Sequence, residues 1–290
     1  MTPNLKLAEV CALAFLETFG EACTERPKEV LRRLGLEIEA VEADSFDGAL
    51  LRVPGAGTIV VNTRIRNSER RRFTIWHEVG HFVLPNQQDL STPCAAEQIE
   101  RGDYDRSRWA EAEANRFAAE VLMPRSRLTE ILRTPPTFES IRAIADVCAV
   151  SLTAAAFRLT ELTSHRVAVV WSKRGEAVWY SSSQEFGRAV LRGSLSDRSY
   201  AYDVFQNEAV PERLEYVPAT AWLRDVNLRE GARILEHSFA LPSYEATLSL
   251  LVIPERIERH TDFDEEDEDA LDPNEFTLER RHWPTRRRSR

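Results

Sequence analysis

Apolar residues recur every three or four positions near the start of the chain, which is the period of an amphipathic helix. This spacing runs from Leu5 to Phe19. A second helix is predicted from Pro27 to Leu34, because proline favours the first turn of a helix and Gly35 follows the last one. A short extended run from Leu36 to Val41 comes next. The pattern then predicts two more apolar helices, around residues 73–82 and from residue 109 to Pro124.

The middle of the chain predicts two short helices joined by a tight turn. Apolar residues keep a helical spacing between Thr137 and Leu162, and Ser151 is a suitable N-cap for the second helix. The segment resembles a helix-turn-helix module. Its second helix offers only Arg158 as a basic side chain, and a helix that reads base edges normally presents several basic or amide groups. Direct DNA binding is therefore disfavoured, and a structural or repressor-docking role is favoured.

Beyond His165 the pattern changes to the apolar runs of β-strands. Two hairpins are predicted: residues 166–172 pair with 177–182, and residues 233–240 pair with 246–253. Gly175 lies in the first of the two connecting turns. The last third of the chain is therefore expected to fold around a sheet.

The predicted helix around residues 73–82 carries a candidate metal site. His77, Glu78 and His81 form the pattern H-E-x-x-H. Residues four apart lie on one face of a helix, so both imidazoles can bind one metal ion while Glu78 lies beside the water bound to that ion. Glu78 is then the candidate general base of a metallopeptidase. A catalytic zinc site typically has a third protein ligand.

The alanine-rich helix that ends at Pro124 offers that third ligand. Glu111 and Asn115 lie one turn apart, so Glu111 can bind the metal while Asn115 orients a ligand imidazole. Glu113 points about 200° away from Glu111 by helical geometry. The small side chains of Ala114 and Ala118 would let the two helices approach closely. Each histidine or glutamate taken singly could also be an ordinary polar residue on a helix surface. The prediction of a metal site depends on their combination in two neighbouring helices.

These two segments together resemble one known family. R-F-T-I-W-H-E-V-G-H-F followed by E-A-E-A-N-R-F-A-A-E-V-L-M-P is similar to the ImmA/IrrE family of metallo-endopeptidases. The resemblance implies that His77, His81 and Glu111 bind the metal, that Glu78 is the catalytic base, and that Asn115 supports a ligand. It also extends to residues 58–62, which are interpreted either as an edge strand that a substrate strand joins or as a plain core strand.

The order of segments resembles the IrrE/PprI-like, radiation- and desiccation-response branch of that family. The fold class predicted on this basis is α+β. The predicted parts are a zincin-like, gluzincin-type peptidase domain (1–130), a helix-turn-helix module (131–163), a GAF-like sensor domain (164–258) and a disordered tail (259–290). The tail is first acidic and then basic.

The resemblance also implies a substrate and a metal. The expected activity is cleavage of an XRE-type, DdrO-like repressor, which would induce a DNA-damage and stress regulon. The ligand types suit Zn²⁺, with Mn²⁺ as the alternative. Two other functions stay open: a non-enzymatic DNA-binding regulator, and an antirepressor peptidase of a mobile element or a toxin–antitoxin-like operon. The sequence makes no prediction of oligomeric state.

Composition and charge agree with the expectation of a cytoplasmic enzyme. The net charge of −9 argues against a protein that coats nucleic acid. The first predicted helix is interrupted by charged residues, so neither a signal peptide nor a membrane segment is expected. The four cysteines include no C-x-x-C pair, so reduced thiols are expected, and Cys94 in a polar loop is a candidate reactive one.

Two further sets of residues have open interpretations. Tyr104 lies between the two chemical segments and could stabilise an oxyanion, although a surface tyrosine is favoured. The arginines at positions 70–72 could contact a substrate, although solvation of the helix start is favoured.

Overall fold

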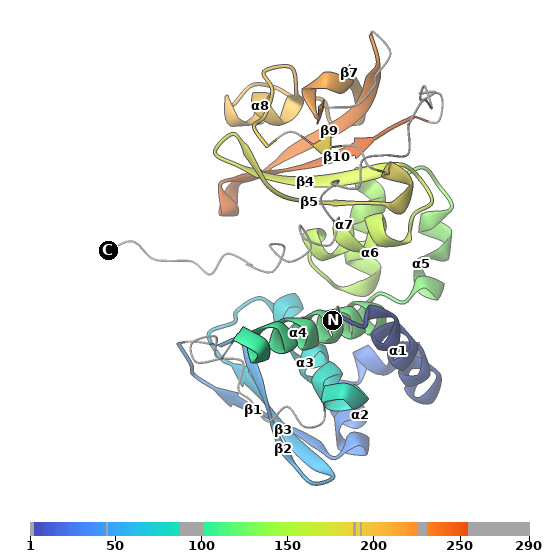
Figure 1. Ribbon diagram of the computed structural model, residues 1–290, viewed down its shortest axis with the longest axis vertical. Helices are drawn as coiled ribbons and strands as arrows, with labels where there is room; N and C mark the ends of the chain where they lie inside the picture. The colour runs from blue at the N-terminus through green and yellow to red at the C-terminus, as the bar shows by residue number, and fades with distance from the viewer. Residues whose placement is uncertain are drawn as a thin grey trace. The chain divides into compact units, whose positions relative to one another are not determined.

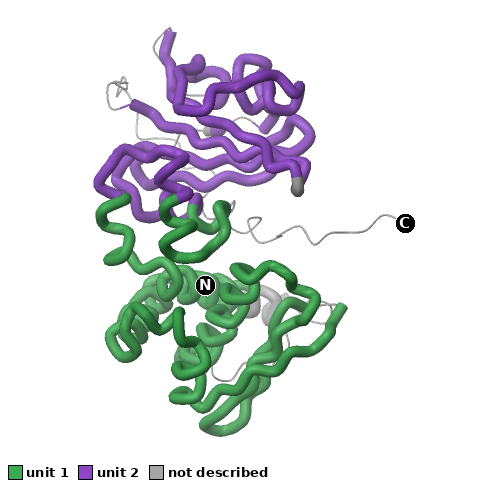
Figure 2. Tube along the Cα trace, turned by 180° about the vertical axis from the view of Figure 1, so that it is seen from behind, with its two compact units in different colours: residues 1–131, 143–155 green, residues 132–142, 156–290 purple. Residues whose placement is uncertain are grey.

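The computed structural model describes residues 3–44, 46–87, 101–187, 190–191, 193–224 and 231–254 (Figure 1). The side chains of residues 101–107, 190 and 243 are not among them. Two compact units are present: residues 1–131 with 143–155, and residues 132–142 with 156–290 (Figure 2). Each unit has helices and a sheet, which confirms the α+β class. Cys94 and the predicted tail lie outside the described residues.

The first unit is built mainly from helices. The bounds of the first two match the prediction, and Gly35 ends the second with a left-handed backbone (φ 73°), as a helix C-cap requires. The helical elements of this unit are α1 (Leu5–Phe19), the 3₁₀ turn η1 (Glu21–Glu25), α2 (Pro27–Leu34), α3 (Ser68–Val83), η2 (Pro85–Gln87), α4 (Arg101–Leu122) and α5 (Arg125–Leu132).

A three-stranded sheet completes the first unit. Its strands are β1 (Leu36–Val41), β2 (Gly48–Val53) and β3 (Ala56–Asn62), in the order β1-β3-β2. The central strand β3 runs parallel to β1 and antiparallel to β2. The interpretation of residues 58–62 as an edge strand is therefore wrong, and the core-strand interpretation is confirmed. The edges of this sheet are β1 and β2, and the sequence pattern did not predict β2.

Helix α3 lies at the centre of the first unit. It packs against α4 and against β2 and β3, and α1 packs on α4. Trp76 of α3 is 1% exposed, and its ring meets Phe15 of α1 edge to face at 5.8 Å. A Cβ atom at Gly80 would lie 3.2 Å from the Ala114 backbone, so α3 and α4 touch closely where both side chains are smallest. The expected close approach of the two helices is confirmed.

The second unit is built on a five-stranded antiparallel sheet. Both predicted hairpins are present, as β4 with β5 and as β9 with β10. The strand order is β5-β4-β10-β9-β7, and β6 pairs with β8 in a separate ribbon. The strands are β4 (Val167–Lys173), β5 (Glu176–Ser182), β6 (Val190–Leu191), β7 (Glu215–Pro218), β8 (Leu223–Arg224), β9 (Arg233–Leu241) and β10 (Ala246–Val252), accompanied by helix α8 (Tyr200–Phe205) and the 3₁₀ turns η3 (Gln184–Phe186), η4 (Ala219–Ala221) and η5 (Pro242–Tyr244).

Two short helices lie where the helix-turn-helix was predicted. These are α6 (Phe138–Cys148) and α7 (Leu152–Leu162), and the angle at the break between them is 111°. The division into units passes through both helices. The separate module 131–163 stays a prediction.

Within the described residues, no single helix is long and apolar enough to span a membrane. Only the bent pair α6 and α7 passes such a test, on length and composition alone.

The turn after α6 is attached to α3 within the first unit. Ala149 has a left-handed backbone, with φ at +50°, which costs a residue with a Cβ atom about 1–2 kcal/mol. The Arg72 guanidinium donates hydrogen bonds to the carbonyl oxygens of Cys148 (3.1 Å) and Ala149 (2.7 Å). The last carbonyl groups of a helix point away from its own N–H donors, and these bonds give two of them a donor from α3.

Replacing Ala149 with glycine is expected to stabilise the protein by about 0.5–1 kcal/mol, because glycine adopts a positive φ without strain. The same change at Ala145, inside α6, is expected to destabilise by about 1 kcal/mol or more. Urea unfolding of both variants measures the two effects. A loss of stability in Ala149→Gly would contradict the assignment of strain to this turn.

Candidate metal centre

Helix α3 brings the two histidines of the H-E-x-x-H pattern together. His77 and His81 are one turn apart, and their ring centroids lie 4.6 Å from each other with the planes at 86°. Their Nε2 atoms are separated by 3.0 Å. The two nitrogens therefore face one small volume on one side of α3.

Glu111 of α4 reaches the same volume. Its Oε2 lies 3.2 Å from Nε2 of His77, and its Oε1 lies 3.2 Å from Nε2 of His81. One ligand atom from each of the three residues lies within 4.8 Å of the others. Across the part of the chain that the structure describes, these three residues form the one group of His, Cys, Asp and Glu side chains with such geometry.

The other nitrogen of each imidazole is held by an amide. Nδ1 of His77 lies 2.9 Å from Oδ1 of Asn115, which is the residue expected to orient a ligand. Nδ1 of His81 lies 2.6 Å from Oε1 of Gln87. An amide oxygen only accepts hydrogen bonds, so each Nδ1 carries the donated proton when the imidazole is neutral. Each Nε2 then keeps its lone pair for the centre of the site.

Sequence reasoning did not find Gln87. It lies in the 3₁₀ turn η2, directly after α3, where no helical or strand period applies. The sequence feature that could have indicated Gln87 is its position six residues after His81. At that separation the chain can turn back toward the end of α3. Gln87 is 1% exposed, which is rare for an amide side chain unless its hydrogen bonds are satisfied.

Glu78 lies beside this group, in a position suited to moving protons. It is 3% exposed, and its Oε2 atom is buried without a hydrogen-bond partner. Burial raises the pKa of Glu78, and the negative charge of Glu111 raises it further, while the two histidines act in the opposite direction. A carboxylate with a raised pKa and a free oxygen is a stronger proton acceptor than an exposed one.

The charges of His77 and Glu111 are coupled. Burial is the largest single effect on the pKa of His77 and lowers it, but the adjacent Glu111 carboxylate, together with Glu78 and Asn115, raises that pKa to about 9. Burial alone would raise the pKa of Glu111, but the two histidines hold it well below its usual range. Without a cation, His77 is therefore the positive partner of Glu111 at neutral pH.

These donors fit a divalent metal ion. Two imidazole nitrogens with free lone pairs and one carboxylate match the three protein ligands of many catalytic zinc sites, and they also suit manganese. The buried carboxylate of Glu78 interacts electrostatically with all three of these residues and has one oxygen without a hydrogen-bond partner. His77, His81 and Glu111 would hold the ion, and Glu78 would stay beside it.

Other residues singled out from the sequence lie outside this group. Glu113 accepts hydrogen bonds from the side chains of Gln87 (2.9 Å) and Asn86 (2.7 Å) and is not part of the group around the two Nε2 atoms. Arg70 forms an ion pair with Asp47, and Arg72 binds the end of α6 as described above. The residue at position 104 lies in the first turn of α4, and its side chain is not described.

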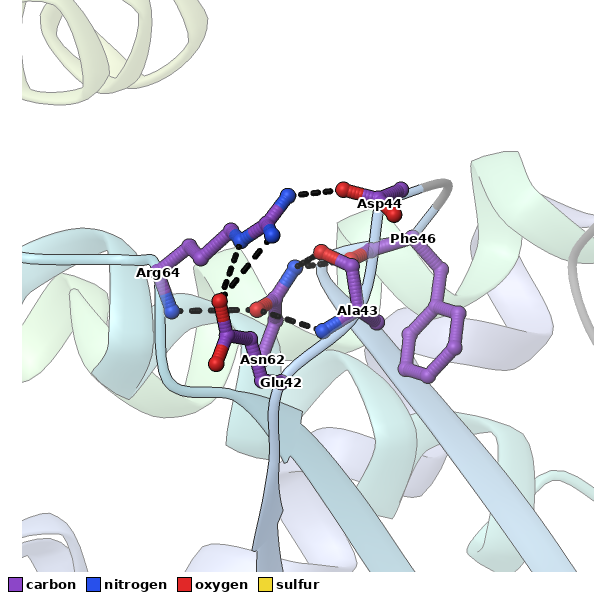
Figure 3. A network of polar contacts seen from close by, with 6 residues as sticks. All are labelled: Glu42, Ala43, Asp44, Phe46, Asn62 and Arg64. Carbon is purple, nitrogen blue, oxygen red and sulfur yellow. Dashed lines mark hydrogen bonds and ion pairs between the residues drawn. The ribbon is translucent and has the colours of Figure 1, made fainter.

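The segment that leads into β2 is fixed by Asn62, at the end of β3. Its amide donates to the carbonyl oxygens of Ala43 (2.8 Å) and Phe46 (2.7 Å), and Arg64 binds Glu42 and Asp44 above it (Figure 3). These contacts place the start of β2 against α3 in the region of Glu78.

Gly48, the first residue of β2, leaves room for Glu78. A Cβ atom there would lie 3.0 Å from Oε1 of Glu78 and would collide with the Thr74 methyl group. Gly48→Ala is therefore expected to destabilise the protein by about 1–3 kcal/mol and to displace Glu78. Thermal unfolding tests this, with Gly193→Ala as the control, because a Cβ atom there meets nothing within 4 Å. Equal stability of both variants would contradict the close approach.

Comparison with known proteins agrees with this geometry. The family model described as the IrrE N-terminal-like domain matches residues 25–160, which include both helices of the site. A Deinococcus radiodurans protein named "Radiation response metalloprotease IrrE" is 28% identical over 212 residues, which cover 69% of this chain and 61% of that protein. The Deinococcus deserti protein of the same name is 33% identical over 235 residues, which cover 76% of this chain and 79% of that protein.

A solved structure shows a related fold. It is titled "Mycobacterium tuberculosis transcriptional regulator", and its TM-score is 0.54 at 16% identity, over 86% of this chain and 76% of that one. This likeness concerns the fold alone, and the chain spans less than two thirds of the first Deinococcus relative. From the family model and the 33% identity over most of the second relative, the chain belongs to the ImmA/IrrE family of metallopeptidases.

Proposed function

We propose that the protein is a metal-dependent endopeptidase that cleaves an XRE-type, DdrO-like repressor and so induces a stress-response regulon. One observation carries the peptidase part. The Nε2 atoms of His77 and His81 and the carboxylate of Glu111 meet beside a buried Glu78 that has an unpaired oxygen. The names of the Deinococcus relatives support the link to a radiation response.

Each residue of the site has a separate role in the proposed reaction. A bound Zn²⁺ or Mn²⁺ would supply Lewis acidity for the scissile carbonyl and a more acidic water. Glu78 takes one proton from the attacking water as the water oxygen bonds to the carbonyl carbon. The carbon–nitrogen bond then breaks, and Glu78 delivers that proton to the leaving amine. Asn115 and Gln87 keep the two imidazoles in place during these steps.

The edge strand β2 is the proposed docking position for the substrate chain. In the three-stranded sheet it has β3 on one side only, and it packs against α3, which carries Glu78. An extended segment of the repressor would add to this edge through backbone hydrogen bonds. The apolar side chains of Leu51 (55% exposed) and Val53 (61% exposed) are available to contact substrate residues.

The rest of the chain is assigned to substrate docking and sensing. We assign α6 and α7 to a helix-turn-helix module that docks the repressor, and the antiparallel sheet of the second unit to a GAF-like sensor domain. The burial of Arg158 supports docking over DNA contact. It is 1% exposed and lies 3.2 Å from Glu161, so the one basic side chain of α7 is turned away from solvent. A repressor substrate places the activity in the cytoplasm.

Incubation with a purified XRE-type repressor from the same genome tests the function. Mass spectrometry, with Zn²⁺ or Mn²⁺ added in parallel, is expected to find a single cleavage site that is absent with Glu78→Gln. A repressor that stays intact with either metal would refute the proposed substrate. If the metal-free protein also retarded promoter DNA in a sequence-selective, salt-dependent way, direct DNA binding would replace peptidase activity as the function.

A further inference from the structure

A chain of hydrogen bonds runs from His81 through two buried side chains. Gln87 accepts at Oε1 from Nδ1 of His81 (2.6 Å) and donates from Nε2 to Oε2 of Glu113 (2.9 Å). Glu113 is 4% exposed and Gln87 is 1% exposed, so water does not take the place of these partners. The chain therefore links the end of α3 to α4 behind the candidate metal ligands.

The surroundings of Gln87 determine which way its amide points. Its Nε2 donates both to the carbonyl oxygen of Ala110 (3.1 Å) and to Glu113, and a carbonyl oxygen only accepts. If the amide were turned by 180°, its oxygen would face two acceptors, and its nitrogen would face His81. The Oε1 atom is therefore held toward His81 by groups on α4.

Glu113 is itself fixed from two other directions. Its Oε1 accepts the backbone N–H of Asn4, the N-cap of α1, at 2.7 Å. Its Oε2 also accepts from the side chain of Asn86 at 2.7 Å. A carboxylate with three donors, one from the start of α1 and two from η2, has little freedom to turn.

From this geometry we infer that Gln87 and Glu113 are positioning residues for the metal site, with Glu113 acting through Gln87 to hold the His81 ring with Nε2 toward the ion. The inference rests on the metal site of the proposed function. Supporting hydrogen bonds of this kind typically change metal affinity by about 10- to 100-fold when they are removed. His77 has a shorter arrangement of the same type, in which the Asn115 side chain holds its Nδ1 at 2.9 Å.

Metal affinity of the full chain, measured by competition with a chromophoric chelator, tests the inference. Gln87→Met keeps the side-chain volume and removes the acceptor, so its affinity for Zn²⁺ is expected to fall by about 10- to 100-fold. Gln87→Asn keeps the amide on a stem one methylene shorter, and a smaller loss is expected. Glu120→Gln is the control, because Glu120 is a buried carboxylate of α4 that pairs with Arg116 instead.

A double-mutant cycle separates the two residues. If Glu113 acts through Gln87, Glu113→Gln weakens Zn²⁺ binding alone but adds no further loss to Gln87→Met. The absorption spectrum of the Co²⁺-loaded protein should also change in Gln87→Met, because the His81 ring turns, whereas a loss of fold stability alone would leave that spectrum unchanged.

Three outcomes would overturn the inference: wild-type affinity in Gln87→Met, an unchanged Co²⁺ spectrum in that variant, or additive losses in the double variant. These outcomes leave the proposed peptidase activity standing. Conversely, a wild-type protein that binds Zn²⁺ and cleaves no repressor would refute the proposed function and leave the positioning role intact.

Discussion

Replacing Glu78 with glutamine is expected to lower peptide cleavage by about 10²- to 10⁴-fold while the protein still binds its metal. The change keeps the shape of the side chain but removes the atom that accepts a proton. In the structure this carboxylate is buried, has one unpartnered oxygen and has a raised pKa, so no other described group beside His77 and His81 is equally suited to the task.

Cleavage rate and Zn²⁺ affinity should be measured on the same preparation of Glu78→Gln. Retained cleavage would remove Glu78 as the base. Loss of both cleavage and Zn²⁺ binding would instead show that Glu78 supports the metal site, because Glu78 lies on α3 between the two candidate ligands His77 and His81. Gly193→Ala, purified in the same way, is the control variant, because that position lies in the second unit. Its cleavage rate and Zn²⁺ affinity should equal those of the wild type.

Replacing Glu111 with glutamine is expected to weaken metal binding by more than the roughly 10- to 100-fold that loss of a supporting hydrogen bond causes. The variant loses the negative charge that lies 3.2 Å from both Nε2 atoms. Chelator competition measures the effect, with Glu120→Gln as the matched control on the same helix. Unchanged affinity would exclude Glu111 as a ligand.

The same variant should also change how the stability of the metal-free protein depends on pH. The folded-state pKa of His77, about 9, lies above its ordinary value of 6.5, so the folded protein binds this proton more tightly than the unfolded chain. The resulting stabilisation is complete below about pH 6.5 and is lost as the pH rises through about 9. Unfolding measured across this range should show the decline in wild type and not in Glu111→Gln.

Local signals were enough to predict six of the eight described α-helices, all but α5 and α8, and much of the candidate site. Pro27 and Gly35 mark the ends of α2 through backbone preferences that need no tertiary contact. The spacing of His77 and His81 fixes their common face through helix geometry alone. Glu111 could be paired with them because α4 is also a regular helix, whose periodicity limits which side chains share a face.

Features that depend on distant contacts were not predictable in the same way. The apolar pattern of a run such as residues 58–62 is the same for a central strand and for an edge strand. The position of β3 in the sheet depends on its pairing with both β1 and β2, which are separate segments of the chain. Gln87 joins the site through a short turn and a bond to Glu113, 26 residues away. The burial of Arg158 depends on packing around α7, which the sequence pattern does not show.

The bonds from Arg72 to the end of α6 affect where the chain can be cut. A fragment ending at residue 130 would keep both helices of the candidate metal site but would lose the carbonyl acceptors of Cys148 and Ala149, leaving a half-buried guanidinium on α3 without them. The match to the family model extends to residue 160 and so includes that turn. The smallest independently stable catalytic fragment should therefore retain α6 and the beginning of α7, and a protease-resistant core should end beyond them.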